Sequence, residues 1–161
     1  MDAGAHVGRG ANRAWMVLTG MMQLPAAPTR VLETCLYVAD MKSSRAFYEG
    51  ILGLAPLFAD ERMTGYRIGD TMLLLFAHGA GDKPVDTGSG VIPPHGGEGN
   101  VHFALSVARD ALDAWRELVE GAGIAVESTV SWPRWNAESL YFRDPDGHLV
   151  ELAGAGLWGI E

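Results

Sequence analysis

The sequence predicts an α+β fold built from two copies of one βαβββ module. The chain has 161 residues, of which 48% are hydrophobic and 20% charged, an ordinary composition for a globular protein with a sizeable core. The same order of strand and helix patterns occurs twice, over residues 31–77 and again over residues 100–153. Between the two copies, residues 78–99 contain seven glycines and three prolines without any periodicity, which indicates a loop.

The first copy opens with the apolar alternation of a strand at Val31–Val38. Asp40 follows at the position of a helix cap, and the apolar spacing predicts a helix over about residues 42–52. Gly53 is expected to end that helix. Three further strands are then expected, at Leu54–Ala59, Gly65–Ile68 and Met72–Phe76.

The second copy repeats this order, beginning with a strand at Val101–Val107. Asp110 is predicted to cap a helix that Gly121 and Gly123 end. The apolar face of that helix is expected to consist of Leu112, Trp115, Leu118 and Val119. Strands are expected at Ile124–Trp132, Ser139–Arg143 and His148–Ala153, the last two joined by the turn at residues 144–147.

The two ends of the chain fall outside this repeat. Residues 1–30 are rich in glycine, alanine and arginine, and we interpret them as a disordered extension, a secretory signal being the weaker alternative. Residues 154–161 are expected to form a C-terminal tail. We therefore predict one domain over residues 31–153, made of the modules 31–77 and 100–153.

Charge and composition exclude several classes of partner. Twelve basic residues against twenty acidic ones give a formal net charge of −8, which argues against nucleic acid, because phosphate contacts need clustered lysine and arginine. The single cysteine rules out an internal disulfide framework and cysteine-rich zinc sites. No apolar stretch approaches the roughly 20 residues that cross a bilayer, so we expect no membrane partner and a cytoplasmic location.

Placing one copy over the other brings chemically capable side chains to equivalent positions. Glu33 in the first strand of one copy lies over His102 in the other, and Leu74 in the last strand lies over Glu151. Three of these four positions can bind a metal. A carboxylate flanked by apolar residues on a strand is costly to bury alone. Two carboxylates and an imidazole that meet at one centre would avoid this cost by binding a divalent cation.

Three segments then resemble a known family. They are Glu33–Asp40 (ETCLYVAD), Ala46–Leu54 (AFYEGILGL) and Tyr141–Leu152 (YFRDPDGHLVEL), of which the last is the most specific. Together they resemble the vicinal oxygen chelate superfamily, also called the glyoxalase/bleomycin resistance/dioxygenase family, over residues 31–153. The resemblance implies that the curled mixed sheets of the two modules enclose a cleft, that first- and last-strand residues bind a metal, and that the protein is a homodimer.

The resemblance also implies roles for individual residues. The expected metal ligands are Glu33, His102 and Glu151, holding one divalent ion per chain, with Mn²⁺, Fe²⁺, Zn²⁺, Ni²⁺ and Mg²⁺ all left open. Such an ion would act as a Lewis acid toward two oxygens of a small substrate. Glu33 and Glu151 are the expected catalytic residues, and an alternative role for Glu33 is that of a base not bound to the metal.

Departures from the family pattern leave the reaction class open among lyase, isomerase, transferase and dioxygenase. Most members have histidine where this chain has Glu33. Glyoxalase-type lyases use all four equivalent positions, and Leu74 cannot coordinate a metal. The three-position layout matches fosfomycin-modifying transferases, but we find no basic cluster for a phosphonate. It also resembles extradiol dioxygenases, but those combine two histidines with one carboxylate.

Five residues are predicted to contact the substrate: Tyr37, Leu74, Trp132, Arg134 and Trp135. Two interpretations of the last three stay open. The loop that carries them either lines the cleft and stacks on a planar ligand, or Trp132 only covers the end of the sheet.

Two classes of function follow from the sequence. The favoured one is a metal-dependent enzyme of small-molecule metabolism. The alternative is a non-catalytic protein that sequesters a drug or metabolite, as bleomycin resistance proteins do, without metal or turnover. A homodimer is expected in either case, because two open sheets leave edges that a monomer would expose.

Overall fold

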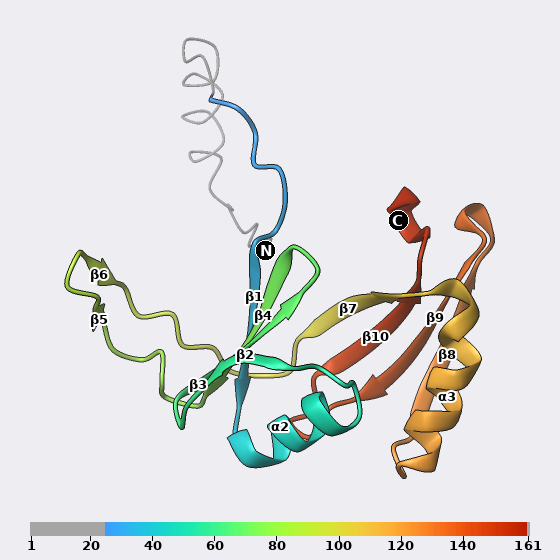
Figure 1. Ribbon diagram of the computed structural model, residues 1–161, viewed down its shortest axis with the longest axis horizontal. Coiled ribbons are helices and arrows are strands. Elements are labelled where there is room, and N and C mark those ends of the chain that lie inside the picture. Colours follow the sequence, from blue (N-terminus) through green and yellow to red (C-terminus); the bar gives the residue numbers. More distant parts are fainter. Residues whose placement is uncertain (1–24, 161) are drawn as a thin grey trace, which may run out of the picture. The chain divides into compact units, whose positions relative to one another are not determined.

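The computed structural model describes residues 25–160 (Figure 1). The compact unit that carries the fold begins at Leu32. Residues 25–31 belong to a separate unit and contain no helix or strand. The extension predicted for residues 1–30 therefore lies mostly outside the described residues, as does Glu161.

The first module forms a four-stranded sheet with one helix. Its strand order is β1-β4-β3-β2, in which β1 runs parallel to β4 and the other neighbours are antiparallel. The elements are β1 (Glu33–Val38), α2 (Met41–Gly50), β2 (Pro56–Ala59), β3 (Met63–Ile68) and β4 (Thr71–Ala77).

The second module repeats this topology. Its strand order is β7-β10-β9-β8, again with a parallel outer pair and antiparallel neighbours (Figure 1). The two predicted βαβββ modules are therefore confirmed, as two separate open sheets. The elements are β7 (His102–Val107), α3 (Leu112–Gly121), β8 (Val126–Trp132), β9 (Ala137–Arg143) and β10 (Leu149–Gly154).

The registers of the two sheets are equivalent. The first residues of β1 and β7 are Glu33 and His102. The residue that pairs with the third position of the opening strand is Leu74 in the first sheet and Glu151 in the second. The predicted superposition of these positions is therefore confirmed.

Helix α2 begins as the sequence predicts. One carboxylate oxygen of Asp40 accepts hydrogen bonds from the backbone N–H groups of Lys42 at 2.9 Å and Ser43 at 3.2 Å. Hydrogen bonds to a carboxylate favour its charged form, so they hold the pKa of Asp40 below its usual value.

Helix α3 begins differently, and the prediction that Asp110 caps it is wrong. Asp110 lies in a 3₁₀ turn, η1 (Arg109–Ala111), and the N-cap residue is Ala111, without a side-chain cap. In this turn the N–H of Ala111 is already bonded to the carbonyl of Ala108 at 3.0 Å. Neither α-helix of residues 25–160 is long and apolar enough to cross a membrane.

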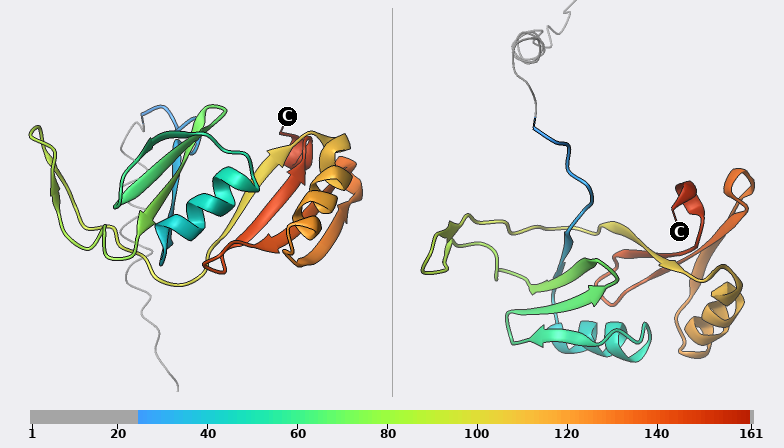
Figure 2. Two further views of the ribbon diagram at one scale, coloured as in Figure 1. Left: turned by 60° about the horizontal axis from the view of Figure 1, so that its bottom comes forward. Right: turned by 45° about the horizontal axis from the view of Figure 1, so that its top comes forward.

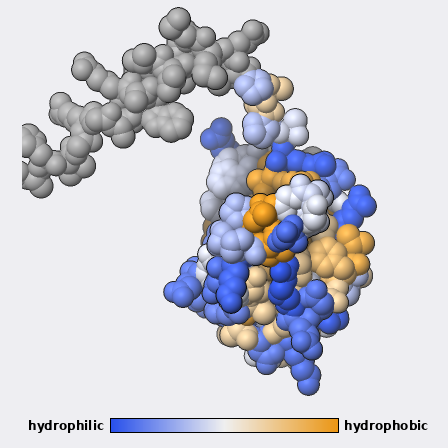
Figure 3. All heavy atoms as spheres, turned by 90° about the vertical axis from the view of Figure 1, so that its left-hand side faces the viewer, coloured by the Kyte–Doolittle hydropathy of each residue, from blue (hydrophilic) through white to orange (hydrophobic). Residues whose placement is uncertain are grey.

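The loop between the modules contains a short hairpin that the sequence pattern did not show. Strands β5 (Val85–Asp86) and β6 (Val91–Ile92) have only two residues each, too few to produce a visible alternation. In both views of Figure 2 the hairpin extends away from the first sheet. The side chains of Val91 and Ile92 are exposed, and Figure 3 shows on this side a limited group of hydrophobic atoms framed by hydrophilic ones.

One hydrophobic core joins the two modules. Helix α2 packs on the first sheet and also reaches the second module, as Figure 2 shows. The ring of Phe47 lies 6.2 Å from that of Phe142, and the ring of Tyr48 lies 6.4 Å from that of Phe103. Each sheet thus buries one face in this core and leaves the other face free for a site.

The closing turn, residues 144–148, adds polar bonds between the modules. The hydroxyl of Tyr48 donates to Asp144 at 2.7 Å, and the hydroxyl of Ser44 donates to Asp146 at 2.8 Å. Burial and the neighbouring Asp144 raise the pKa of Tyr48, so this hydroxyl keeps its proton. The turn therefore holds α2 of the first module through two carboxylates of the second.

His148 completes the closing turn and is only 2% exposed. Its Nδ1 accepts from the N–H of Val101 at 3.2 Å, and its Nε2 donates to the carbonyl of Tyr37 at 3.0 Å. This pair of bonds requires the neutral imidazole with its proton on Nε2. His148 is thus a structural link between β1 and the chain entering β7.

Candidate functional site

The polar side chains of the second module collect on the face of its sheet that the core does not cover. The opposite face packs into the core through Phe103, Phe142 and Val150. Strand alternation and the pairing register place the remaining side chains together on the first face. We call this the site face; it carries His102, Ala104, Ser106, Trp132, Ala137, Ser139, Tyr141, Leu149, Glu151 and Ala153.

Glu151 is the buried centre of the site face. It is 5% exposed, and its Oε2 lies 3.1 Å from Nε2 of His102, a side chain that is half exposed. Its other oxygen, Oε1, accepts a hydrogen bond from the hydroxyl of Ser139 at 2.5 Å. That hydroxyl in turn accepts from the indole N–H of Trp132 at 2.9 Å. The carboxylate is therefore fixed from one side and directed toward the imidazole on the other.

The hydrogen-bond pattern of His102 prepares it as a metal ligand. Its Nδ1 lies 3.3 Å from the carbonyl oxygen of Leu149, which can only accept, so Nδ1 carries the hydrogen. In the neutral ring, Nε2 then has a free lone pair that faces a carboxylate oxygen of Glu151. Two acceptors at 3.1 Å repel each other unless a proton or a metal cation lies between them. The donor set and the backbone bond behind the imidazole both fit a divalent transition ion.

Tyr141 and Ser139 belong to the site although the sequence analysis did not find them. Tyr141 pairs directly with Glu151 across β9 and β10, and its ring centre lies 6.0 Å from that of His102. Burial, followed by the interaction with Glu151, raises the pKa of Tyr141, so its hydroxyl stays protonated at neutral pH. The sequence did offer one signal for them. The length of the closing turn sets the pairing register of β9 and β10, and this register decides which residues lie opposite Glu151.

Glu33 lies on the equivalent free face of the first sheet, away from the His102–Glu151 pair. In the single chain, over residues 25–160, no three His, Cys, Asp or Glu side chains gather closely enough to hold a metal ion. Glu33 opens β1 of the first sheet, whereas His102 and Glu151 belong to β7 and β10 of the second. The same face carries Cys35, whose pKa is raised by burial and then by the charge of Glu33. The structure thus brings two of the three predicted ligands together.

Two predicted substrate residues also lie on the free face of the first sheet. The hydroxyl of Tyr37 is engaged with the carbonyl and the Nδ1 of His95 in the inter-module loop, and its ring stacks 6.0 Å from Phe76. Leu74 is buried in the middle of the sheet, between its partners on β1 and β3. Their roles toward a substrate stay predictions.

The other three predicted substrate residues lie at the end of β8 and in the turn that follows it. Trp132 is on the site face and belongs to the hydrogen-bonded chain that ends on the Glu151 carboxylate. Arg134 and Trp135 follow in the 3₁₀ turn η2 (Pro133–Trp135), where the guanidinium of Arg134 lies 5.3 Å from the centre of the Trp135 ring. Of these three residues, Trp132 is the one whose side chain is hydrogen-bonded to Ser139, the residue that fixes the Glu151 carboxylate.

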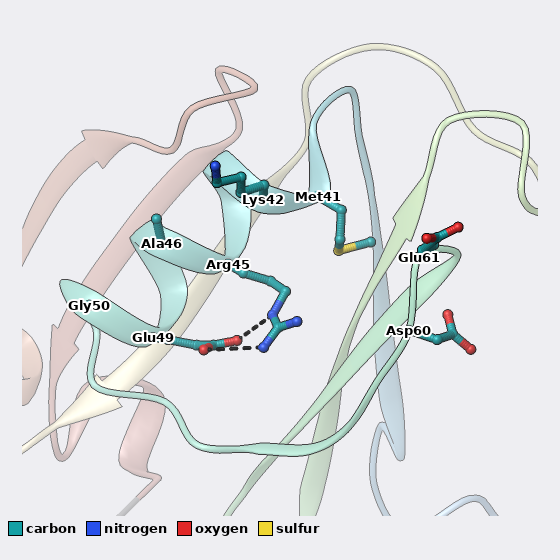
Figure 4. Close-up of a pocket in the computed structure, with 8 residues that line it drawn as sticks. All are labelled: Met41, Lys42, Arg45, Ala46, Glu49, Gly50, Asp60 and Glu61. Carbon is teal, nitrogen blue, oxygen red and sulfur yellow. Dashed lines mark hydrogen bonds and ion pairs between the residues drawn. The ribbon is translucent and has the colours of Figure 1, made fainter.

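Apart from the site face, the structure has a hollow between α2 and the turn that joins β2 to β3. It measures about 610 Å³, and Figure 4 shows Arg45 and Glu49 paired within it at 2.7 Å. The hollow lies on the helix side of the first sheet and includes none of the predicted site residues. Its lining is Met41, Lys42, Arg45, Ala46, Glu49, Gly50, Asp60 and Glu61.

Comparison with known protein families gives a match over residues 30–152 to the Glyoxalase/Bleomycin resistance protein/Dioxygenase superfamily. The chain belongs to this superfamily. The match covers both modules, so the family resemblance seen in the three sequence segments is confirmed.

Individual relatives in this superfamily include enzymes with thiol-related names. The metallothiol transferase FosB of Shouchella clausii is 29% identical over 116 residues, which are 71% of this chain and 73% of the relative. The glutathione transferase FosA of Serratia marcescens is 30% identical over 120 residues, 73% of this chain and 74% of the relative. The crystal structure of a lactoylglutathione lyase from Agrobacterium tumefaciens matches with a TM-score of 0.74 and 33% identity, covering 84% of this chain and 100% of that one.

Proposed function

We propose that the protein is a divalent-metal-dependent enzyme acting on a small molecule that presents two neighbouring oxygens. His102 and Glu151 of one chain, together with Glu33 of a second chain, would hold the ion. One observation carries the proposal: Nε2 of His102 and Oε2 of Glu151 face each other at 3.1 Å, an arrangement that either a proton or a divalent cation between them would stabilise. The equivalent position of the other module supplies Glu33, a third donor of suitable chemistry.

The residues around this pair have separable tasks in the proposed reaction. A bound divalent ion would supply Lewis-acid polarisation of a substrate oxygen. Ser139 holds the rotamer of Glu151, so that one carboxylate oxygen stays available for binding. The hydroxyl of Tyr141 retains its proton, and it can donate a hydrogen bond to a substrate oxygen beside Glu151.

Among the possible reaction classes we favour group transfer. Two relatives are named as thiol-using transferases, and the third is a lyase of a glutathione adduct. Leu74 stands at the fourth equivalent position, where glyoxalase-type lyases have a ligand, so the lyase reaction has less support. A reduced small-molecule thiol as co-substrate would also agree with the cytoplasmic location that we propose.

The proposal requires a homodimer in which the first module of one copy faces the second module of the other. In the single chain Glu33 is exposed on the free face of its sheet, and hydrophobic side chains are exposed at Phe58 in the same module and at Val91 and Ile92 in the hairpin that follows it. A second copy would cover such surface and would supply Glu33 to the pair formed by His102 and Glu151.

Metal binding by purified protein tests this function. Protein prepared without chelators is expected to hold about one divalent ion per chain and to gain thermal stability from Mn²⁺ or Zn²⁺. Glu151→Gln keeps the side-chain volume but removes the charge, so this variant should lose the ion and keep its fold, as judged by circular dichroism. A Glu138→Gln variant changes an exposed carboxylate of the same sheet on the other face, and should bind metal like the unmodified chain.

The proposal of a metal-dependent enzyme would be contradicted if the wild-type protein bound no divalent ion and gained no thermal stability from Mn²⁺, Fe²⁺, Zn²⁺, Ni²⁺ or Mg²⁺. A non-catalytic sequestering protein would then be the better description.

A further inference from the structure

The site face continues past Glu151 into a small apolar hollow. It has a volume of about 130 Å³. Ala104, which pairs directly with Glu151, forms part of its floor, so the hollow begins beside the His102–Glu151 pair. It lies between the strands β7 and β10 and the 3₁₀ turn η3 (Leu157–Gly159), and it is lined by Ala104, Ser106, Ala153, Gly154, Leu157, Trp158 and Ile160.

Trp158 forms one wall of this hollow and belongs to a cluster of three indoles. Its ring centre lies 4.6 Å from that of Trp135 and 5.9 Å from that of Trp132. Trp132 is itself bonded through Ser139 to the carboxylate of Glu151. The aromatic cluster and the candidate metal ligands therefore form one connected structure.

The backbone holds Trp158 in an unfavourable conformation. Its φ angle is +60°, the left-handed region that residues with a side chain rarely adopt. The side chain remains 62% exposed, so burial of the indole offsets little of this strain. The turn is kept closed by the N–H of Gly156, which donates to the carbonyl of Ile160 at 2.8 Å. Strained residues that the surrounding structure keeps in place are typical of ligand sites.

We infer that this hollow binds one benzene-sized aromatic ring of the substrate whose oxygens are held at His102 and Glu151. The inference rests on the proposed function and names its substrate class: small aromatic compounds with two neighbouring oxygens a few bonds from the ring. The volume of about 130 Å³ is close to that of an apolar cavity of roughly 150 Å³ that takes up benzene. The indole of Trp158 offers an aromatic wall, which prefers a flat ring to a saturated one.

Two probes with the same oxygens and different rings test this inference. Mandelate has a planar phenyl ring beside a 2-hydroxy acid, and hexahydromandelate has a puckered cyclohexyl ring at the same position. Titrated calorimetrically into Mn²⁺-loaded protein, mandelate is expected to bind about two- to tenfold more tightly, the range for an aromatic contact beyond simple burial. Trp158→Ala should reduce this preference to near one. Trp115→Phe is the matched control, because Trp115 packs on the core side of α3, and it should keep the preference.

The outcomes separate this inference from the proposed function. Equal affinities of the two probes for the wild-type protein, or a preference that survives in Trp158→Ala, would overturn the aromatic site while metal-dependent binding still stood. Binding of neither probe at millimolar concentrations would also overturn it. Probe binding that persists without Mn²⁺ and in Glu151→Gln would instead refute the metal centre. If Trp158→Ala converts a dimer to a monomer and leaves the preference unchanged, Trp158 is an interface residue and the inference is wrong.

Discussion

At Glu151, a single carboxylate combines burial, a fixed rotamer and an acceptor directed at an imidazole. One of its oxygens accepts a hydrogen bond from Ser139, and the other faces Nε2 of His102 at 3.1 Å, where a proton or a metal cation would balance the buried charge. That Glu151 and His102 share a sheet face was predictable, because strand alternation and the internal repeat place them at the positions equivalent to Leu74 and Glu33. Ser139 was not predictable in the same way, since a serine on a strand carries no signal until its cross-strand neighbours are known.

Ser139 provides a prediction at this scale. Ser139→Ala removes the donor that fixes Glu151, and we expect affinity for Mn²⁺ to fall about 10- to 100-fold, the usual effect of losing a hydrogen bond behind a metal ligand. Isothermal titration calorimetry measures it. Ser131→Ala is the control, because the Ser131 hydroxyl donates to Glu138 at 2.9 Å on the exposed surface. An unchanged affinity in Ser139→Ala would show that Glu151 is oriented by other contacts.

At the level of elements, the two helices differ in how they begin, although the modules repeat. Asp40 caps α2 through backbone hydrogen bonds, whereas α3 is preceded by a 3₁₀ turn and has no side-chain cap. An aspartate before an apolar helical pattern predicts a cap in both cases, and only local backbone geometry decides between them. Sequence periodicity likewise could not predict the β5–β6 hairpin or the left-handed backbone of Trp158. Each involves too few residues to form a repeating pattern.

The cap of α2 gives a pH prediction whose sign follows from its pKa. Because the folded pKa of Asp40 is lower than the unfolded value of about 3.9, the cap contributes its full stabilisation above that value. This contribution is lost as the pH falls through the folded pKa. Asp40→Asn should keep a cap at neutral pH but lose the titrating group. The difference in thermal midpoint between the two proteins should therefore shift in favour of Asn between pH 5 and pH 3.

Circular dichroism melts at both pH values provide the measurement, at low salt because the group is exposed. Asp110→Asn serves as control, since Asp110 caps no helix. A difference between Asp40→Asn and wild type that does not change with pH would contradict the prediction.

For the whole molecule, the important feature is that the two free sheet faces do not meet within one chain. Alternation and register predicted which residues share a face, and the structure confirms this equivalence. They do not predict which faces come together, because that depends on how α2 packs between the modules. The predicted three-ligand centre is therefore present in halves, with Glu33 on one sheet and the His102–Glu151 pair on the other.

Mixing two defective variants tests the dimer that would join these halves. Glu33→Gln and Glu151→Gln chains should each bind little metal alone. In a mixed dimer, one site combines both substituted residues and the other combines the intact Glu33 with the intact His102 and Glu151. Co-refolded mixtures should therefore regain about one ion per mixed dimer, measured by metal analysis of the separated species. No recovery, or light scattering that reports a monomer for the wild type, would contradict an intermolecular site.

The closing turn has a consequence for synthesis on the ribosome. The partners of Tyr48 and Ser44 in α2 are carboxylates about 100 positions later in the chain, at Asp144 and Asp146. Strand β10, which lies between β7 and β9, emerges later still. The N-terminal half can form its own sheet as it leaves the exit tunnel, but Tyr48 and Ser44 lack their bonds to Asp144 and Asp146 until the closing turn has been translated. A nascent chain stalled before the codon for Asp144 should therefore be a substrate for chaperones and proteases rather than a stably folded protein.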